Sequence, residues 1–306
     1  MNADPKALLP AASGRTELWP VRPISYSPAV KAVNRGLNLL PWPWGEDMMA
    51  LLGVVQAFAR VSRLRRALRW AAAQPGARGR WGLALSLLSH HGRFIAMEAL
   101  VGIREPEALR RHLIVEGEEH LIKAAEKGGT LLLGFHLGPS HVPLALRVIG
   151  HRVTLVGDLE HSGRRPGATW LPFLNPSESL SISGRKPGGR LGGLYQARRL
   201  LLDGGTLFIT ADGPFGSEAF RVPLPGGAMV IRSGWLALRG HTRAPTLPVL
   251  TYLDGRKRVV TIHAALPAVE ADPARDMAVC RAALSPLLEE YVQRFPEQCR
   301  SLAFWS

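Results

Sequence analysis

Two polar residues of the 306-residue chain follow apolar runs, a position where catalytic side chains often lie in folds that alternate strands and helices. His136 follows the run TLLLGF and precedes a turn that contains Gly138 and Pro139. Asp212 closes the run TLFITAD and precedes the turn sequence GPFG. An imidazole is suited to take a proton from a weak nucleophile near neutral pH, and a carboxylate can hold its tautomer. General-base chemistry is therefore the first hypothesis.

Two other kinds of chemistry fit this part of the sequence less well. His136, His141 and Asp212 together offer two imidazoles and a carboxylate, a common ligand set for a divalent metal. The two histidines, however, are not spaced to share one helical face, so we do not expect a metal site. We expect no cofactor either. Ser140 lacks the G-x-S-x-G pattern that surrounds a serine hydrolase nucleophile.

The elements that must position these residues follow from the change in hydrophobic period after residue 129. From there the chain alternates short apolar runs with helical stretches, the pattern of a sheet with helices on its faces. Strands are expected at 130–135, 152–157, 206–212, 244–253 and 258–266. Helices are expected at 142–149, 191–205, 228–240 and 276–295. The fold class predicted for 111–306 is α/β, with a mixed, mostly parallel sheet flanked by helices.

The amino-terminal part of the chain is predicted to differ from this domain. Residues 1–28 are rich in Pro, Ser and Ala and are expected to form an extended arm. Residues 29–110 are expected to be helical, to associate with a membrane and to pack with the following domain as one unit. A helix at 81–100 is apolar enough to be buried, so its two histidines, His90 and His91, are expected to be structural.

One segment of this region combines apolar and basic side chains. The run from Met48 to Trp70 is predicted to form one helix, which Trp42 and Trp44 precede. Such a helix can lie in a membrane interface with the stems of its arginines along the apolar region. The alternative is a helix that packs on the core and turns a solvated arginine face outward. The arginines recur every three residues, at Arg60, Arg63, Arg66 and Arg69.

Charge and composition narrow the class of protein. The net charge of +14 attracts nucleic acid, an anionic membrane surface or an acidic carrier protein, and no RNA- or DNA-binding signature supports the first. No run approaches the ~18 uncharged apolar residues of a spanning helix, and residues 1–30 lack the apolar core of a signal peptide. Cys280 and Cys299 have neither disulfide-framework nor zinc-site spacing. We expect a peripheral protein in a reducing compartment.

Four segments resemble, in order and spacing, the sequence blocks of the lipid A biosynthesis acyltransferases, a family within the lysophospholipid acyltransferase superfamily. The first is EGEEHLIKAAEKGGTLLLGFHLGPSH, and the later ones are ADGPFG, VPLPGGAMVIRSGWLALRGHTRAPTLPV and RFPEQCRSLAFW. The resemblance covers about residues 71–305. It implies a glycerolipid acyltransferase-like fold. It also implies an enzyme that moves a fatty acyl chain from acyl carrier protein or coenzyme A to a lipid acceptor, at the cytoplasmic side of the inner membrane.

The resemblance implies that His136 is the general base, but the family carboxylate that should follow it is missing. Its position holds His141, and a neutral imidazole offers no negative charge to stabilise an imidazolium. Three interpretations stay open. Another carboxylate (Asp158, Glu160 or Asp212) replaces the missing one; His136 works unaided at a reduced rate; or the chain is a catalytically degenerate relative that binds a lipid or a partner.

The donors that the resemblance implies carry phosphate, and acyl carrier proteins are acidic, so basic side chains are candidate substrate contacts. Most of them lie in 160–190, a segment rich in Gly, Pro, Ser and Arg that is predicted to be a long loop. A solvated charge run is the alternative interpretation of this segment. The candidate substrate-binding residues are Arg164, Arg165, Arg185, Lys186, Arg190 and Arg221.

Overall fold

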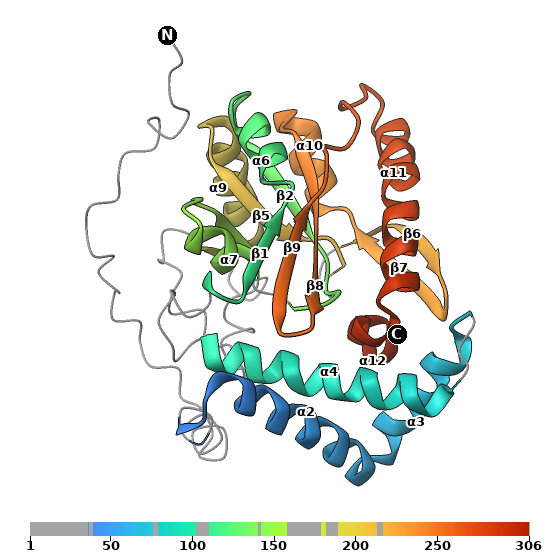
Figure 1. Ribbon diagram of the computed structural model, residues 1–306. Helices are drawn as coiled ribbons and strands as arrows, with labels where there is room; N and C mark the ends of the chain where they lie inside the picture. The colour runs from blue at the N-terminus through green and yellow to red at the C-terminus, as the bar shows by residue number, and fades with distance from the viewer. Residues whose placement is uncertain are drawn as a thin grey trace.

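The apolar runs after residue 110 form a seven-stranded sheet with helices on its faces (Figure 1). The predicted fold class, α/β with a mixed and mostly parallel sheet, is confirmed. The arm predicted over 1–28 and most of the loop predicted over 160–190 lie outside the described residues. The computed structural model of the protein describes residues 36, 39–75, 79–101, 110–139, 142–157, 179–181, 189–212 and 217–305.

The strands of the sheet follow the order β1-β9-β8-β2-β5-β3-β4. Neighbouring strands are parallel, except that β8 and β9 form an antiparallel hairpin. β2 lies in the centre and is buried along its whole length, as expected for a strand covered on both faces. The strands are β1 (Leu113–Glu116), β2 (Thr130–Gly134), β3 (Thr154–Gly157), β4 (Ser179–Ser181), β5 (Thr206–Thr210), β8 (Thr246–Asp254) and β9 (Lys257–Ile262).

Helices cover both faces of the sheet because successive side chains of each strand point to opposite sides. Leu132 of β2 packs with the side chains of α6 and α7. Leu131 and Leu133 belong to a separate cluster on the other face, which includes residues of α9, α10 and α11. The helices are α6 (Glu118–Ala125), α7 (Val142–Val148), α9 (Gly189–Leu202), α10 (Gly234–Thr242) and α11 (Pro273–Arg294).

Two more strands, β6 (Glu218–Leu224) and β7 (Gly227–Arg232), form an antiparallel hairpin beside α11. The predicted helix over 228–240 is therefore wrong in its first part, because α10 begins only at Gly234. Met229 and Ile231 are buried and alternate with more exposed neighbours, which is the period of a strand. Pairing with β6 prevails here over the helical pattern of the sequence.

The described part of the amino-terminal region contains the helices α2 (Trp42–Ala59), α3 (Val61–Ala73) and α4 (Arg80–Val101). The single helix predicted from Met48 to Trp70 is wrong, because it breaks at Arg60, whose backbone has φ −118° and ψ 80°. The break redirects α3 so that Trp70 is buried and its indole N–H donates to the carbonyl oxygen of Pro296 at 2.9 Å.

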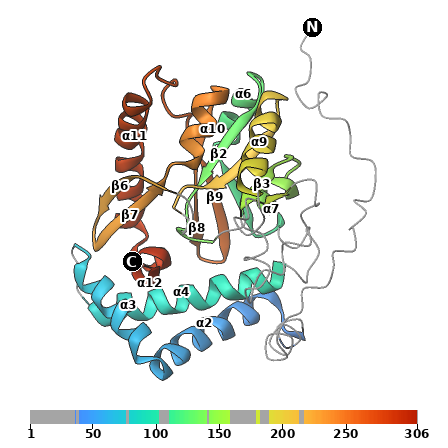
Figure 2. The ribbon, with the colours of Figure 1, turned by 180° about the vertical axis from the view of Figure 1, so that it is seen from behind.

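Helices α2 and α4 lie together beneath the sheet, as Figures 1 and 2 show. Gly92 of α4 touches α2 so closely that a Cβ there would lie 2.0 Å from the carbonyl oxygen of Met49, and Gly53 of α2 makes a similar approach to α4. The Asp47 carboxylate accepts a hydrogen bond from Nη2 of Arg256 at 2.9 Å. The helical layer is thus attached to the turn between β8 and β9.

Candidate active site

The structure brings His136 and Asp212 together at the carboxyl ends of β2 and β5. These strands are parallel and pair Gly134 with Thr210, so the residues two positions further on are level with each other. The Nδ1 atom of His136 lies 2.9 Å from Oδ1 of Asp212. The backbone N–H of His136 also donates to Oδ1 and Oδ2 of Asp212, at 3.0 Å each. The register of the central strands therefore builds a histidine–carboxylate pair.

The surroundings of this pair suit a base. The side chain of Asp212 is 4% exposed, whereas that of His136 is 21% exposed. With the ring proton on Nδ1, where the carboxylate accepts it, the lone pair of the imidazole lies on Nε2. The covered carboxylate also stabilises the imidazolium that forms when Nε2 takes a proton. The geometry therefore orients the imidazole so that Nε2 is free of the contact with Asp212 at the carboxyl edge of the sheet.

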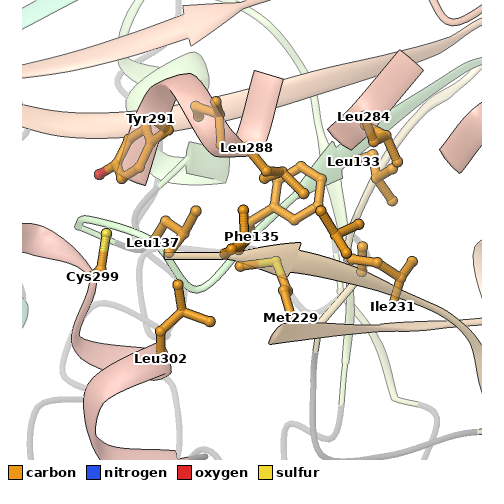
Figure 3. Close-up of a cluster of buried hydrophobic side chains, with 14 of the residues drawn as sticks. Leu133, Phe135, Leu137, Met229, Ile231, Leu284, Leu288, Tyr291, Cys299 and Leu302 are labelled. Atoms are coloured by element: carbon orange, nitrogen blue, oxygen red, sulfur yellow. The ribbon is translucent and has the colours of Figure 1, made fainter. Parts of the chain in front are cut away.

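The residues on either side of His136 anchor it in the core. Phe135 and Leu137 are both buried, and Figure 3 shows them in one cluster with Met229 of β7, Leu288 of α11 and Leu302. Leu302 belongs to the last helix, α12 (Arg300–Trp305), which follows the short 3₁₀ helix η4 (Pro296–Gln298). The packing of these two neighbours fixes the backbone that carries the imidazole.

The turn after His136 requires glycine at position 138. Gly138 has φ +65°, in the left-handed region that other residues rarely adopt. A Cβ there would lie 1.9 Å from the carbonyl oxygen of Thr251 and 2.7 Å from the hydroxyl of Tyr291. The Gly138 N–H donates to the carbonyl oxygen of Gln298 at 3.2 Å. The turn thus lies directly against β8 and the carboxyl-terminal segment.

Most of the other predicted site residues lie outside the described part of the chain. Arg190 lies within α9, but nothing is described of its side chain. The alternative carboxylates Asp158 and Glu160 also lie outside. The predicted catalytic residue His141 and the predicted substrate contacts of the loop are likewise outside, namely Arg164, Arg165, Arg185 and Lys186.

Arg221, the remaining predicted substrate contact, lies on β6 in an exposed position. Its Nε and Nη2 atoms donate to the carboxylate of Glu218 at 2.9 and 3.2 Å, and this hydrogen bonding raises the pKa of the guanidinium. Arg221 also lines an open groove of about 490 Å³ between β6 and α11, together with Met277 and Arg281. It therefore lies beside this groove and pairs with a carboxylate of its own strand.

The two histidines expected to be structural both lie in α4. His91 contacts the ring of Phe304, with 5.4 Å between the ring centroids, and burial lowers its pKa to about 3. His90 lies 3.0 Å from the carbonyl oxygen of Ser86 through Nδ1, and burial lowers its pKa as well. Among the described residues, no three His, Cys, Asp or Glu side chains gather closely enough to hold a metal ion. No helix within the described ranges has the length and apolar character needed to cross a bilayer.

The fold and the His136–Asp212 pair define a class of protein, an α/β protein with a histidine–carboxylate pair at the carboxyl edge of a mostly parallel sheet. The family model described as bacterial lipid A biosynthesis acyltransferase matches residues 22–302. The chain therefore belongs to the bacterial lipid A biosynthesis acyltransferase family, and the resemblance noted from its sequence blocks is confirmed.

A comparison with solved structures finds similarity to the 1-acyl-sn-glycerophosphate acyltransferase PlsC from Thermotoga maritima. The sequences are 16% identical, the match covers 82% of this chain and 96% of that protein, and the TM-score is 0.42. The comparison with curated proteins gives no match.

Proposed function

We propose that the protein is a peripheral membrane acyltransferase that moves a fatty acyl chain from a thioester donor, acyl carrier protein or coenzyme A, to a lipid acceptor. Membership in a family of lipid acyltransferases supports the general reaction. The observation that carries the proposal is the His136–Asp212 pair, because it supplies an oriented and partly exposed imidazole at the carboxyl end of a central strand.

The reaction that we propose uses His136 as general base. Its Nε2 takes the proton from the hydroxyl or amine of the acceptor as the oxygen or nitrogen attacks the thioester carbonyl carbon. The tetrahedral intermediate then collapses, the carbon–sulfur bond breaks, and the thiolate leaves with the proton that the imidazolium returns. Asp212 stabilises the imidazolium between these two steps. The products are an ester or amide of the acceptor and the free thiol of the donor.

The contact between His136 and Asp212 suggests what replaces the family carboxylate that is missing at position 141. Of the three interpretations of His141, the replacement by another carboxylate is the one that the described geometry favours, with Asp212 as that carboxylate. Asp212 comes from a neighbouring strand rather than from the turn that follows His136. We therefore propose an active enzyme rather than a degenerate binding protein.

Attachment to an anionic membrane surface is the second part of the proposal, and the exposed face of α2 supports it. Trp44, Leu51, Val55 and Phe58 are each more than half exposed, and their spacing of seven, four and three residues places them on one side of the helix. We call these four residues the α2 apolar face. An exposed apolar stripe of this kind with a basic helix beside it is typical of an interfacial helix.

The basic neighbour of this face is α3. Arg65 and Arg69 are exposed there, while Arg63 donates to Oε1 of Gln56 and Arg66 to the carbonyl oxygen of Phe304. The net charge of +14 adds attraction to an anionic leaflet. We place the protein at the cytoplasmic side of the inner membrane, where thioester donors of this kind are available.

Transfer of labelled acyl chains by the purified protein tests the proposed reaction. The assay supplies acyl carrier protein and coenzyme A thioesters in parallel, with vesicles of total bacterial lipid as acceptors. The His136→Ala variant should lose transfer. The matched control is His151→Ala, because Nε2 of His151 also lies 2.7 Å from a carboxylate, Glu118, but His151 precedes the amino end of β3. Undiminished transfer by His136→Ala would overturn the assignment of the base.

A further inference from the structure

The turn that follows His136 consists of residues 137–139, and each of them is hydrogen-bonded to a group far away in the sequence. The single hydroxyl proton of Thr251 is shared between the carbonyl oxygens of Leu137, at 3.1 Å, and of Pro139. The N–H of Gly138 donates to the carbonyl oxygen of Gln298 at 3.2 Å. Strand β2 ends at Gly134, so these contacts take over the support of the chain where the strand pairing ends.

Gln298 connects this turn to the end of β8. Its side chain is buried and pairs with the backbone of Leu253: Nε2 donates to the carbonyl oxygen at 2.9 Å, and Oε1 accepts from the N–H at 2.7 Å. One residue thus binds Leu253 with its side-chain amide and Gly138 with its backbone carbonyl. Loss of the amide would leave two buried backbone groups of β8 without their partner, which is costly.

Tyr291 completes the support from the same side. Its hydroxyl donates to the carbonyl oxygen of Thr251 at 2.7 Å, and burial raises the pKa of this phenol well above its ordinary value, so the hydroxyl keeps its proton. The support therefore forms a connected set. Tyr291 and Gln298 fix two points of β8, and β8 together with Gln298 fixes the turn.

We propose that Gln298 is a positioning residue for His136, an inference that rests on the proposed function of His136 as general base. Gln298 touches no reacting atom. It fixes the backbone of 137–139 relative to β8, and through this backbone it holds the imidazole within hydrogen-bond distance of Asp212. Misplacement of a catalytic group by about 1 Å through a remote change can lower turnover about 10²-fold.

The variant that tests this role is Gln298→Glu, assayed at alkaline pH to ionise the introduced carboxyl group, because a carboxylate of the same shape cannot donate to the carbonyl oxygen of Leu253. The matched control is Gln74→Glu. Gln74 is a second buried glutamine, and its Nε2 donates to the carbonyl oxygen of Pro225, in the turn between β6 and β7. Both variants should lower the melting temperature. Only Gln298→Glu should lower kcat, by about 10²-fold with KM little changed.

A spectroscopic measurement separates positioning from a general loss of stability. In protein labelled with ¹⁵N-histidine, the Nδ1–H resonance of His136 is identified by its loss in His136→Gln. This resonance should shift or broaden in Gln298→Glu and stay unchanged in Gln74→Glu. Thr251→Val, which keeps the side-chain shape but removes the hydroxyl, should behave as Gln298→Glu does and serves if Gln298→Glu does not fold.

The outcomes distinguish this inference from the proposed function. Suppose that the wild type transfers acyl chains and His136→Gln does not. The positioning role is then overturned if Gln298→Glu or Thr251→Val has the same kcat and the same His136 resonance as the control Gln74→Glu. If His136→Gln keeps full transfer, the proposed function of His136 fails. In that case the His136 resonance alone still decides whether Gln298 positions the imidazole.

Discussion

At the scale of single residues, the carboxylate of Asp212 contacts both the backbone and the ring of His136. It accepts from the N–H and from Nδ1 of the same histidine, so its position is tied to the backbone as well as to the imidazole. A carboxylate held only by the ring could follow the ring when it rotates. Asp212 instead gives the ring of His136 one preferred orientation.

The Asp212→Asn variant tests this function at the residue scale. The new amide can still accept from the His136 N–H, but its NH₂ group can donate to Nδ1 and so favour the tautomer with the proton on Nε2. We expect activity to fall by about 10²- to 10⁴-fold while the melting temperature stays within a few degrees of wild type. A large drop in melting temperature, with activity in proportion to the folded protein, would show that Asp212 is only structural.

Gly138→Ala tests the close contact of the turn with β8. Gly204 is the control, because it also has a positive φ, +85°, but a Cβ there has nothing within 4 Å. Gly204→Ala should cost about 1–2 kcal/mol for the left-handed backbone. Gly138→Ala should cost at least about 2 kcal/mol more, since the added methyl group must displace Thr251. Urea unfolding measures both, and equal losses would contradict the contact.

At the scale of elements, the packing of α4 against α12 introduces a pH dependence of stability. Burial, together with the charges of Arg300 and Arg63, lowers the pKa of His91 to about 3 in the folded protein, against about 6.5 when unfolded. Between these values the unfolded chain binds a proton that the folded chain does not. The contribution of His91 to the free energy of unfolding should therefore fall with pH below 6.5, by about 2 kcal/mol at pH 5.

His91→Gln isolates this contribution because glutamine has no charge in the same pH range. Urea unfolding at pH 7 and pH 5 should show that the wild type loses about 2 kcal/mol more than the variant does. His241→Gln is the control, since it removes an imidazole from an exposed position at the end of α10. An identical pH dependence in His91→Gln and wild type would show that the ring is solvated in the folded protein.

The strands that carry His136 and Asp212 could be predicted from the sequence. Elements that form only by pairing with distant segments could not. TLLLGF and TLFITAD are apolar enough to be strands in any α/β fold, so His136 and Asp212 could be placed at strand ends. Their contact depends on the pairing of Gly134 with Thr210, which no local pattern encodes. The strand β7 was mistaken for helix because AMVIRSGWLALRG fits both periods until β6 pairs with it.

Two other features of the fold were missed for related reasons. The break at Arg60 involves no proline or glycine, so the sequence from Met48 to Trp70 remains a good helix until the burial of Trp70 redirects it. The short edge strand β1 was not predicted, because Leu113–Glu116 is partly exposed and depends on its pairing with β9. Gln298 could be singled out only as part of a family block, since its partner Leu253 lies 45 residues away.

At the scale of the whole molecule, the helical layer lies at the carboxyl edge of the sheet that carries His136. The turn after His136 contacts η4, and η4 packs on α4, which in turn packs on α2 (Figure 1). A lipid acceptor that approaches from a surface under α2 would therefore meet the side of the molecule that carries the base. Under the proposed function, the α2 apolar face and His136 would therefore face the same membrane surface.

The double variant Val55→Glu with Phe58→Glu tests this arrangement. Each apolar side chain buried in the interface contributes at least about 1.5 kcal/mol, so the variant should bind anionic vesicles about a hundredfold more weakly. Ile122→Glu with Leu202→Glu is the control, because it makes the same charge change at exposed apolar residues of α6 and α9. Vesicle sedimentation compares the two, and equal binding would refute the orientation.

The register between β2 and β5 has a consequence for how members of this family are sorted. A survey that demands an acidic residue inside the histidine motif would discard this chain as inactive, because His141 stands there. A criterion taken from three dimensions would retain it: an acidic residue two positions beyond the end of the strand beside the one that carries the histidine. With that criterion, loss of the motif carboxylate and loss of the histidine–carboxylate pair can be scored separately in each sequence of the family.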